Sequence, residues 1–281
     1  MAAAMVDSGG VVSGPARAAT PDSDDAEEVF GALAAVIDRV RASTDGVPVI
    51  CGVGCGGPML SGGEEVSPLN IRAWRGFPLR RRLADEIGLA VAVDNDAKAL
   101  ALGEGWVGAA RGVDNYLSMV VSTGIGGGIV LDGRLLDGAQ GNAGHIGHVV
   151  VEPDGRPCPC GGRGCLEAEA SGLSIAAVTG RPASEAGGAV RRRTGTLVGR
   201  AVASVANLLD LELAVVAGSV ALGFGTDFFD AAAEEIRARA QLDFSRCTRI
   251  IPAGLGAEGP LVGAAAVGRR ALVTAGGDAA R

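Results

Sequence analysis

Apolar stretches that end in glycine-rich loops and are followed by helical patterns recur along this 281-residue chain. The clearest are VPVICGVG (47–54), NYLSMVVS (115–122) and LELAVVAG (211–218), continuous apolar runs of the kind that buried strands carry. Helical periodicity is clear in AKALALGEGWVG (97–108) and TLVGRAVASVANLLD (196–210). Because strands alternating with helices build a sheet covered by helices, the pattern predicts an α/β protein of two lobes with a cleft between them.

Shorter patterns supply the remaining elements. The first twenty residues predict two strands, 2–6 and 11–20, joined by a hairpin turn at 7–10. A helix over 25–43 should follow, capped by the polar side chains of 22–24. Further strands are expected at 89–93, 128–136 and 248–254, and further helices at 74–88, 227–242 and 260–275. We therefore expect a first lobe of residues 1–96, completed by the C-terminal helix 260–281, and a second lobe of residues 97–259.

Charge and hydrophobic patterning argue against several classes of protein. A net charge of −7 argues against general binding of nucleic acid or of anionic membranes. No uninterrupted apolar run reaches the roughly 18 residues that indicate a membrane span, and the N-terminus lacks the basic-then-apolar pattern of a signal segment. We therefore expect a cytoplasmic protein, in which clustered cysteines bind metal more often than they form disulfides.

Three of the six cysteines lie within eight residues, in the run Cys158-Pro-Cys160-Gly-Gly-Arg-Gly-Cys165. Glycines let the chain wrap, and three thiols fit the tetrahedral coordination of zinc; a set of free structural thiols is the alternative. A closed zinc site takes four ligands, so one histidine is enough to complete it. The only two histidines of the chain, His145 and His148, stand in GNAGHIGH (141–148), before the cysteine run.

Polar residues at the ends of predicted strands are candidates for catalysis. Val93-Asp94-Asn95-Asp96 joins a strand to a helix, where a carboxylate can accept a proton from a substrate hydroxyl, although such residues also cap helices. Ser122-Thr123-Gly124-Ile125-Gly126-Gly127-Gly128 follows another strand, and its backbone N–H groups can approach a phosphate. It lacks the Gly-Lys-Ser/Thr of a P-loop, and an ordinary turn is the alternative. Ala217-Gly218-Ser219-Val220 also ends a strand and can face a nucleotide.

Together, and in this order, these segments resemble the ROK family of sugar kinases and sugar-responsive repressors. The matching segments are LNIRAWRGFPL (69–79), VDNDAKALALGEG (93–105), STGIGGGIVLDGRLLDGAQGNAGHIGH (122–148), CPCGGRGCLEAEASG (158–172) and AGSVA (217–221). The resemblance implies a two-lobed, actin-like (ribonuclease H-like) ATPase fold. It also implies an ATP-dependent carbohydrate kinase that acts with Mg²⁺ on a monosaccharide and assembles as a homodimer or homotetramer.

The resemblance assigns roles to single positions. Asp96 would be the general base that deprotonates the sugar hydroxyl attacking the γ-phosphate of ATP. The sugar would be bound by Asn70, Asn95, His148 and Glu167. The phosphates would be lined by Thr123, Gly124, Gly126 and Gly127, and the adenosine by Gly218 and Ser219. A structural Zn²⁺ would be held by His148, Cys158, Cys160 and Cys165, in a zinc-binding loop over 145–167.

Two positions depart from the family pattern. Where the family carries Gly-Glu-x-Gly-His, this chain reads GHIGH (144–148). A neutral imidazole offers one donor and one acceptor in place of two acceptor oxygens, so we expect His145 to contact the sugar and to alter sugar preference; packing within the loop is the alternative. The family also opens with a strand ending in Asp-x-Gly-Gly-Thr, whereas the DSGG at 7–10 is expected to be the hairpin turn after that motif. The chain is therefore expected to begin about one strand late, with a central strand missing from the first lobe.

Three functions are compatible with these patterns. The first is phosphorylation of a hexose by ATP, at the 6-hydroxyl as in glucokinases. The second is the same chemistry on an N-acetylhexosamine or amino sugar, since nothing in the sequence decides between them. The third is sugar binding with catalysis impaired by the missing strand. A DNA-binding repressor is not favoured, because the sequence has no basic recognition helix.

Overall fold

The chain divides into two compact units. Unit 1 comprises Met1–Val107, Asp137–Asn142 and the chain from Ala257 onward, and unit 2 comprises Gly108–Leu136 and Ala143–Gly256. The computed structural model describes residues 1–278, so positions 279–281 of the expected C-terminal helix lie outside the described residues. The division differs from the expected boundary at residue 96, because the helix that follows this residue packs within unit 1.

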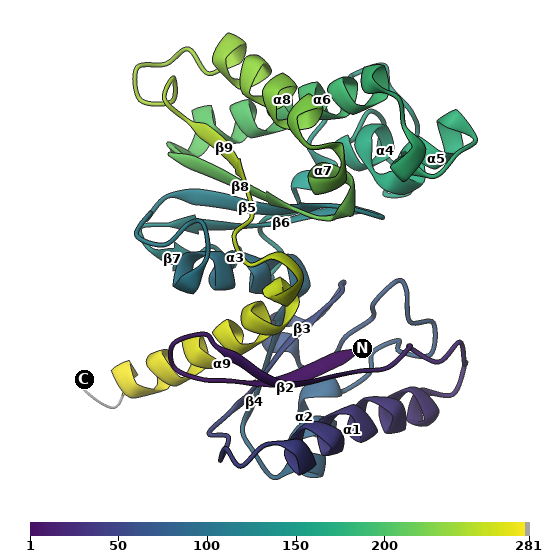
Figure 1. Ribbon diagram of the computed structural model, residues 1–281, viewed down its shortest axis with the longest axis vertical. Helices are drawn as coiled ribbons and strands as arrows, with labels where there is room; N and C mark the ends of the chain where they lie inside the picture. Colours follow the sequence, from purple (N-terminus) through teal and green to yellow (C-terminus); the bar gives the residue numbers. More distant parts are fainter. Residues whose placement is uncertain (279–281) are drawn as a thin grey trace. The chain divides into compact units, whose positions relative to one another are not determined.

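Unit 1 contains two small sheets and the helices that pack on them (Figure 1). Its strands are β1 (Ala2–Val6), β2 (Val12–Arg17), β3 (Cys51–Cys55) and β4 (Val91–Asn95). Its helices are α1 (Ala26–Ser43), α2 (Leu79–Ile87), α3 (Asp96–Val107) and α9 (Gly259–Asp278), and η1 (Ser61–Gly63) is a short 3₁₀ turn. β1 pairs antiparallel with β2, as the predicted hairpin requires, and β3 pairs parallel with β4.

Two helices of unit 1 start later than the sequence suggested. The cap of α1 is Asp25, whose side chain accepts a backbone hydrogen bond of 2.9 Å from the first turn, and not one of residues 22–24. Helix α2 starts after Pro78, because the residue before a proline is disfavoured in helical backbone. Trp74 and Phe77, expected in this helix, instead stack in the core of the unit with their ring centroids 4.8 Å apart.

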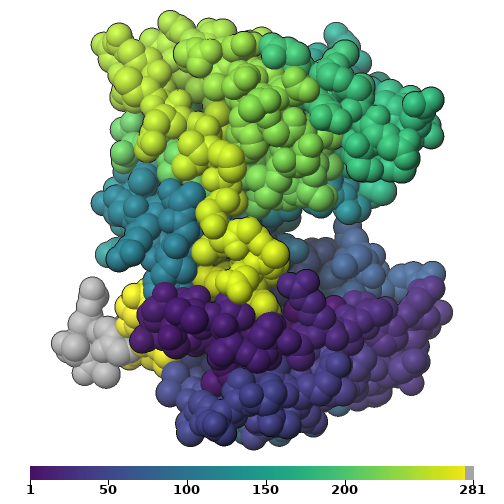
Figure 2. Space-filling view, in the orientation of Figure 1, coloured from purple at the N-terminus to yellow at the C-terminus, as the bar shows by residue number. Residues whose placement is uncertain are grey.

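Helix α9 packs closely against α3 and β3. A Cβ on Gly263 would lie 2.8 Å from the backbone of Ala99 in α3, and a Cβ on Gly52 in β3 would lie 1.9 Å from the carbonyl oxygen of Ala264. Only glycine permits such approach of two backbones, and these contacts place α3 in unit 1. Figure 2 shows α9, in yellow, beside the N-terminal hairpin, in purple, on the surface of this unit.

Unit 2 is built on a five-stranded sheet in the order β7-β6-β5-β8-β9. Its strands are β5 (Tyr116–Val121), β6 (Ile125–Leu131), β7 (Arg134–Leu135), β8 (Leu213–Ala217) and β9 (Arg249–Pro252). β5 pairs antiparallel with β6 and parallel with β8. The predicted hairpin turn is present at Asp132 and Gly133, whose φ angles of 49° and 70° suit a tight hairpin.

The helices of unit 2 include several that the sequence did not indicate. Helix α6 (Gly188–Leu209) begins before the expected residue 196 and packs on α8 (Thr226–Arg239). The short helices α4 (Leu166–Ala170), α5 (Gly172–Thr179) and α7 (Ser219–Phe224) and the 3₁₀ turns η2 (Ile146–His148), η3 (Ala183–Glu185) and η4 (Gly256–Glu258) are additional. Across the described part of the chain, no helix combines the length and the apolar character that a membrane crossing requires.

The two units differ in the middle of their sheets. In unit 2, β5 joins the antiparallel pair β6–β7 to the parallel pair β8–β9. In the described residues of unit 1, the antiparallel pair β1–β2 and the parallel pair β3–β4 form separate sheets. β5 and β8 are almost wholly buried, whereas β1 and β3 are mostly half-buried. Within the part of unit 1 that the structure describes, no strand joins these two pairs as β5 joins the corresponding pairs of unit 2.

Candidate active site and metal centre

The turn from β4 to α3 carries a carboxylate, Asp94, that is held by two cations. Its side chain is 14% exposed, and its oxygens lie 3.0 Å from Nζ of Lys98 and 3.4 Å from Nη1 of Arg270. The same carboxylate accepts a hydrogen bond of 2.8 Å from the backbone N–H of Asn95. Both oxygens of Asp94 are therefore engaged by cations, and the carboxylate is held in place at the end of β4.

A second carboxylate, Asp96, stands at the start of α3 in different surroundings. It makes no ion pair with any residue that the structure describes, and it accepts a hydrogen bond of 2.8 Å from the backbone N–H of Ala97. Loss of solvation raises the pKa of the Asp96 carboxyl, and the hydrogen bonds from the backbone N–H groups of Ala97 and Asp96 oppose this shift only in part. The residue still reaches solvent, so this carboxylate is accessible and takes up a proton more readily than an ordinary aspartate does.

The two amides that were expected to bind sugar in unit 1 border one glycine loop. A Cβ on Gly57 would lie 3.5 Å from Nδ2 of Asn95, and a Cβ on Gly56 would lie 3.6 Å from Oδ1 of Asn70. Asn70 is exposed and Asn95 is half-buried. The structure thus brings Asn70 and Asn95 to the same glycine loop, and Asp96 directly follows Asn95 in the chain.

In unit 2, the loop after β5 is tied to α4 and α7. The backbone N–H of Ile125 donates to Oε2 of Glu167 at 2.9 Å, and a Cβ on Gly124 would lie 3.0 Å from that oxygen. The hydroxyls of Ser122 and Ser219 are hydrogen-bonded at 3.0 Å. The structure thus brings together Thr123 and Gly124, the candidate sugar ligand Glu167, and the pair Gly218–Ser219. Gly126 and Gly127, expected in the same loop, lie instead in β6 and pair with Val120 and Met119 of β5.

Glycines seat the histidine loop against β6. A Cβ on Gly144, whose φ is 101°, would lie 2.5 Å from the carbonyl oxygen of Gly127. A Cβ on Gly147 would lie 2.3 Å from the carbonyl oxygen of Ile125. Between these two glycines, the side chain of Ile146 is buried in the core of unit 2. His145, which precedes Ile146, and His148, which follows Gly147, remain exposed.

The candidate metal ligands form one cluster, comprising His148, Cys158, Cys160 and Cys165, with all four ligand atoms within 4.8 Å of one another. The sulfurs of Cys160 and Cys165 are 3.7 Å apart, as are the sulfur of Cys158 and Nδ1 of His148. Ligands about 2.3 Å from a tetrahedral zinc ion are separated by about 3.8 Å, so these distances fit a single zinc ion. Three thiolates and one imidazole are a donor set that favours zinc. The cluster includes His148 and leaves His145 outside it.

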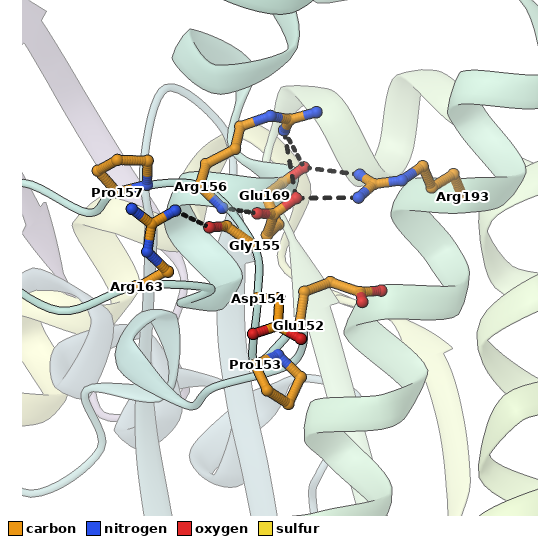
Figure 3. A pocket seen from close by; sticks show the side chains of 9 residues that line it. All are labelled: Glu152, Pro153, Asp154, Gly155, Arg156, Pro157, Arg163, Glu169 and Arg193. Carbon is orange, nitrogen blue, oxygen red and sulfur yellow. Dashed lines mark hydrogen bonds and ion pairs between the residues drawn. The ribbon is translucent and has the colours of Figure 1, made fainter.

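An open pocket of about 500 Å³ adjoins the chain that leads to Cys158 (Figure 3). At its centre, the Glu169 side chain is 2% exposed and pairs with Arg193 at 2.9 Å and Arg156 at 3.3 Å. Burial alone would raise the pKa of Glu169, but hydrogen bonds from the Arg156 backbone and the Arg193 side chain outweigh it and lower the pKa. Because both arginines pair with Glu169, we interpret these ion pairs as structural contacts that hold the metal loop to α4 and α6. No residue assigned above to sugar or nucleotide lines this pocket.

Three buried or paired charges near these sites were not singled out from the sequence: Lys98, Arg270 and Glu169. Lys98 does have a sequence signal, because it is the single lysine among 25 basic residues. The other two have none, since their partners are distant; Arg270 and Asp94 are 176 positions apart.

Comparisons with known proteins agree on one family. The model of the ROK family matches residues 1–271. A glucokinase from Halalkalibacterium halodurans is 47% identical over 133 residues, which cover 46% of this chain and 40% of the relative. An N-acetylmannosamine kinase from Yersinia pseudotuberculosis is 34% identical over 241 residues, which cover 80% of this chain and 81% of the relative. A second glucokinase, from Thermotoga maritima, is 50% identical over 106 residues, and the two matches span 40% and 33% of the glucokinases' own length.

A solved structure shows the same fold. The ROK family glucokinase from Streptomyces griseus, in complex with glucose and AMPPNP, superposes with a TM-score of 0.80 at 29% identity, over 95% of both chains. This likeness confirms the expected α/β fold of the actin-like ATPase type.

Proposed function

The chain belongs to the ROK family, and on that premise we propose that it transfers the γ-phosphoryl group of ATP to a hydroxyl of a hexose, the 6-hydroxyl as in glucokinases. The proposal is supported by the kinases among its relatives and by the glucose and AMPPNP bound in the structure from S. griseus. We place it in the cytoplasm, as a homodimer or homotetramer.

The observation that carries the proposal is the contrast between two carboxylates in one turn. Asp94 lies within 3.4 Å of two cations, whereas Asp96 makes no ion pair within the described chain and has a raised pKa. A base that accepts a hydroxyl proton works best when its pKa approaches the working pH. The pKa of Asp96 is shifted in that direction, and its carboxylate is not engaged by a cation as that of Asp94 is.

The proposed reaction needs little covalent chemistry from the protein. Asn70 and Asn95 hold the sugar, and its attacking hydroxyl donates a hydrogen bond to the Asp96 carboxylate. As the oxygen–phosphorus bond forms and the bond between the γ-phosphorus and the bridging oxygen of ADP breaks, Asp96 takes the hydroxyl proton. Positioning and charge stabilisation supply most of the rate in such phosphoryl transfers.

Unit 2 would supply the nucleotide contacts. In this proposal the phosphates lie against the turn at Thr123 and Gly124 and the adjoining glycines of β6, Gly126 and Gly127, where the lack of a side chain on the glycines lets phosphate oxygens approach the backbone. Gly218 has a φ of 102°, and a Cβ there would meet the Val121 oxygen at 2.3 Å; this bare backbone before Ser219 suits the adenosine side. Bound Mg²⁺ would neutralise phosphate charge during transfer.

The metal cluster would have a structural part in this function. Zinc held by His148, Cys158, Cys160 and Cys165 would fix the loop that precedes α4, and Cys165 immediately precedes that helix. Glu167, in the first turn of α4, would then be held in place to bind the sugar.

Sugar choice is expected to depend on His145. The side chain is exposed, and its ring centroid is 6.2 Å from that of His148. In this proposal His145 binds a sugar hydroxyl through one donor and one acceptor. His145→Ala should therefore change the Michaelis constants unequally across a panel of sugars, and equal constants for every sugar would remove this role.

A coupled assay of ADP release tests the proposed function. Wild-type protein with ATP, Mg²⁺ and a panel containing glucose, mannose, N-acetylglucosamine, N-acetylmannosamine and glucosamine should release ADP with at least one sugar. Asp96→Asn should lower kcat by about 10²–10⁴-fold, the usual contribution of a general base. Asp85→Asn, which alters an exposed carboxylate in α2, is the matched control and should keep full activity.

The outcomes separate the alternatives. A preference for the acetylated or amino sugars would favour the hexosamine kinase. Binding of a sugar in calorimetry without ADP release would favour a catalytically impaired sugar-binding protein. Neither binding nor turnover with any sugar would contradict the sugar-kinase proposal itself.

A further inference from the structure

Lys98 is the only lysine in a chain that otherwise uses 24 arginines for its 25 basic residues. It lies in the first turn of α3, two residues after Asp96, and its side chain is 4% exposed. Burying an ammonium group is costly unless it is paired and hydrogen-bonded. Use of lysine at this one position therefore calls for a reason specific to the site.

The Lys98 ammonium is surrounded by three oxygens, all within unit 1. Nζ lies 3.0 Å from Oδ1 of Asp94, 2.8 Å from Oδ1 of Asp137 and 3.1 Å from the carbonyl oxygen of Gly141. An ammonium has three hydrogens in tetrahedral directions, so each can be donated to one oxygen. The planar guanidinium of arginine presents its donors in a flat fork and does not suit three converging acceptors.

A second cation completes the cluster. Arg270 of α9 lies 3.4 Å from Asp94 and is also hydrogen-bonded to both oxygens of Asp137. Burial would raise the pKa of Asp137, but the hydrogen bonds from Arg270 and Lys98 lower it, so that Asp137 stays ionised. Two cations thus balance two carboxylates, and Lys98 is the more deeply buried of the two cations.

The three oxygens belong to two segments that lie far apart in sequence. Asp94 opens the turn that carries Asn95 and Asp96, and its Oδ1 receives both the Asn95 N–H and the Lys98 ammonium. Asp137 and Gly141 belong to 137–142, a short part of unit 1 whose sequence neighbours on both sides are in unit 2. The chain continues from this segment directly to Ala143, Gly144 and His145.

We propose that Lys98 is a positioning residue for the sugar: its ammonium fixes the turn that carries Asn95 and Asp96, and it anchors the segment that leads to His145. This inference rests on the proposed function in naming a sugar as the substrate. Lys98 itself touches neither substrate nor reacting atoms, and acts through Asp94 and Gly141. Its loss should therefore affect the sugar and not the nucleotide, whose candidate loops belong to unit 2.

The test uses Lys98→Arg, which keeps the charge and removes the three-way geometry. Sugar affinity should fall about tenfold or more, as expected when substrate-positioning groups shift, while the Michaelis constant for ATP stays within about twofold of wild type. In the ligand-free protein, amide hydrogen exchange should become faster in 93–98 and in 137–142. Asp137→Asn, whose carboxyl is half-exposed, should give the same pattern if the lysine variant folds poorly.

Arg82→Lys is the matched control, because Arg82 forms an ion pair with Glu27 in the same unit but outside this cluster. It should leave sugar affinity and exchange in both segments unchanged. If Lys98→Arg and Asp137→Asn also left exchange and sugar affinity unchanged, or raised the constants for sugar and ATP equally, the positioning role would be contradicted. Wild-type protein that bound sugar without releasing ADP would contradict the kinase function while leaving the Lys98 inference to be decided by exchange and affinity; wild-type protein that bound no sugar would contradict both.

Discussion

Asp94 and Asp96 stand two residues apart, and the groups around them decide what each can do. Asp94 is ion-paired with both Lys98 and Arg270. Asp96 has only backbone donors, and incomplete solvation raises its pKa. At the residue scale, then, the two aspartates carry the same group but have different partners, and the second of them, Asp96, is the one proposed as the proton acceptor.

The pH profile of kcat/KM for the sugar should show this difference. As the pH falls through the raised pKa of Asp96, the carboxyl becomes protonated and can no longer accept the hydroxyl proton, so activity declines. The midpoint of this acidic limb should lie above the ordinary aspartate value of 3.8, because kcat/KM reports the free enzyme. Rates of the wild type from about pH 4.5 to 8 provide the measurement.

The same shift has a consequence for stability. A carboxyl whose pKa is raised by folding favours the folded state while protonated, and that contribution is lost as the pH rises through the folded pKa. Asp96→Asn, which keeps an acceptor for Ala97, should therefore be at least as stable as wild type at neutral pH. A less stable variant, or an acidic limb at or below the ordinary value, would argue against the proposed surroundings of Asp96.

At the scale of elements, glycines in the loops of unit 2 allow close contacts with backbone or side-chain oxygens of other segments. Gly144 and Gly147 let the histidine loop approach β6, and Gly124 lets the loop after β5 approach Glu167. At each contact the glycine has no side chain that would keep the histidine loop from β6 or Glu167 from the loop after β5. The high glycine content of the chain is thus used where separate elements must meet.

Gly144→Ala tests this packing. A Cβ there would meet the Gly127 oxygen at 2.5 Å in a backbone with φ of 101°, so we expect a loss of about 1–3 kcal/mol from the free energy of unfolding. Gly31→Ala is the matched control, since a Cβ on that exposed residue of α1 meets nothing within 4 Å. The control should gain about 0.5–1 kcal/mol.

Urea unfolding of both variants gives the comparison. Equal effects of the two substitutions on the free energy of unfolding would show that the close contact between Gly144 and β6 does not matter for stability. Retained metal content in Gly144→Ala would confirm that any loss arises at this contact and not at the cysteines.

For the whole molecule, the division into two units predicts that a local change affects mainly the unit in which it lies. The metal cluster lies entirely in unit 2, whereas the Lys98 cluster lies entirely in unit 1. Each unit has a core of its own. A change confined to one cluster should therefore lower the stability of the unit that contains it more than that of the other unit.

Removal of metal should weaken unit 2 selectively. Chelation should release about one zinc ion per chain, as expected for a single tetrahedral site. If about 2 kcal/mol is lost, Tm should fall by roughly 4–8 °C for a chain of this size. Hydrogen exchange should accelerate around the zinc-binding loop 145–167 and α4, and not in α1 or α2 of unit 1.

Two cysteine variants make the comparison specific. Cys160→Ser should lower metal content and Tm together, because a cluster ligand is lost. Cys247→Ser alters an exposed cysteine outside the cluster and should change neither. Equal metal loss from both variants would contradict the four-ligand site.

The sequence alone determined the features that a short segment encodes. Alternating strand and helix patterns predicted the α/β class, and most of the expected elements are present with small shifts of their ends. The spacing of Cys158, Cys160 and Cys165 predicted a metal cluster whose side chains lie within ligand distance of one another. These predictions succeed because periodicity and donor type are properties of neighbouring residues. The roles assigned to single site residues remain predictions.

Only the tertiary structure decided which segments meet. Helix α3 joins unit 1 through its contact with α9, and Asp94 is neutralised by Arg270 from 176 positions away. Trp74 and Phe77 pack in the core outside α2, a placement that helical periodicity does not record. Long-range burial and charge pairing are set by the folded chain as a whole. For that reason the lone lysine could be counted in the sequence, but its three partners had to be seen in the fold.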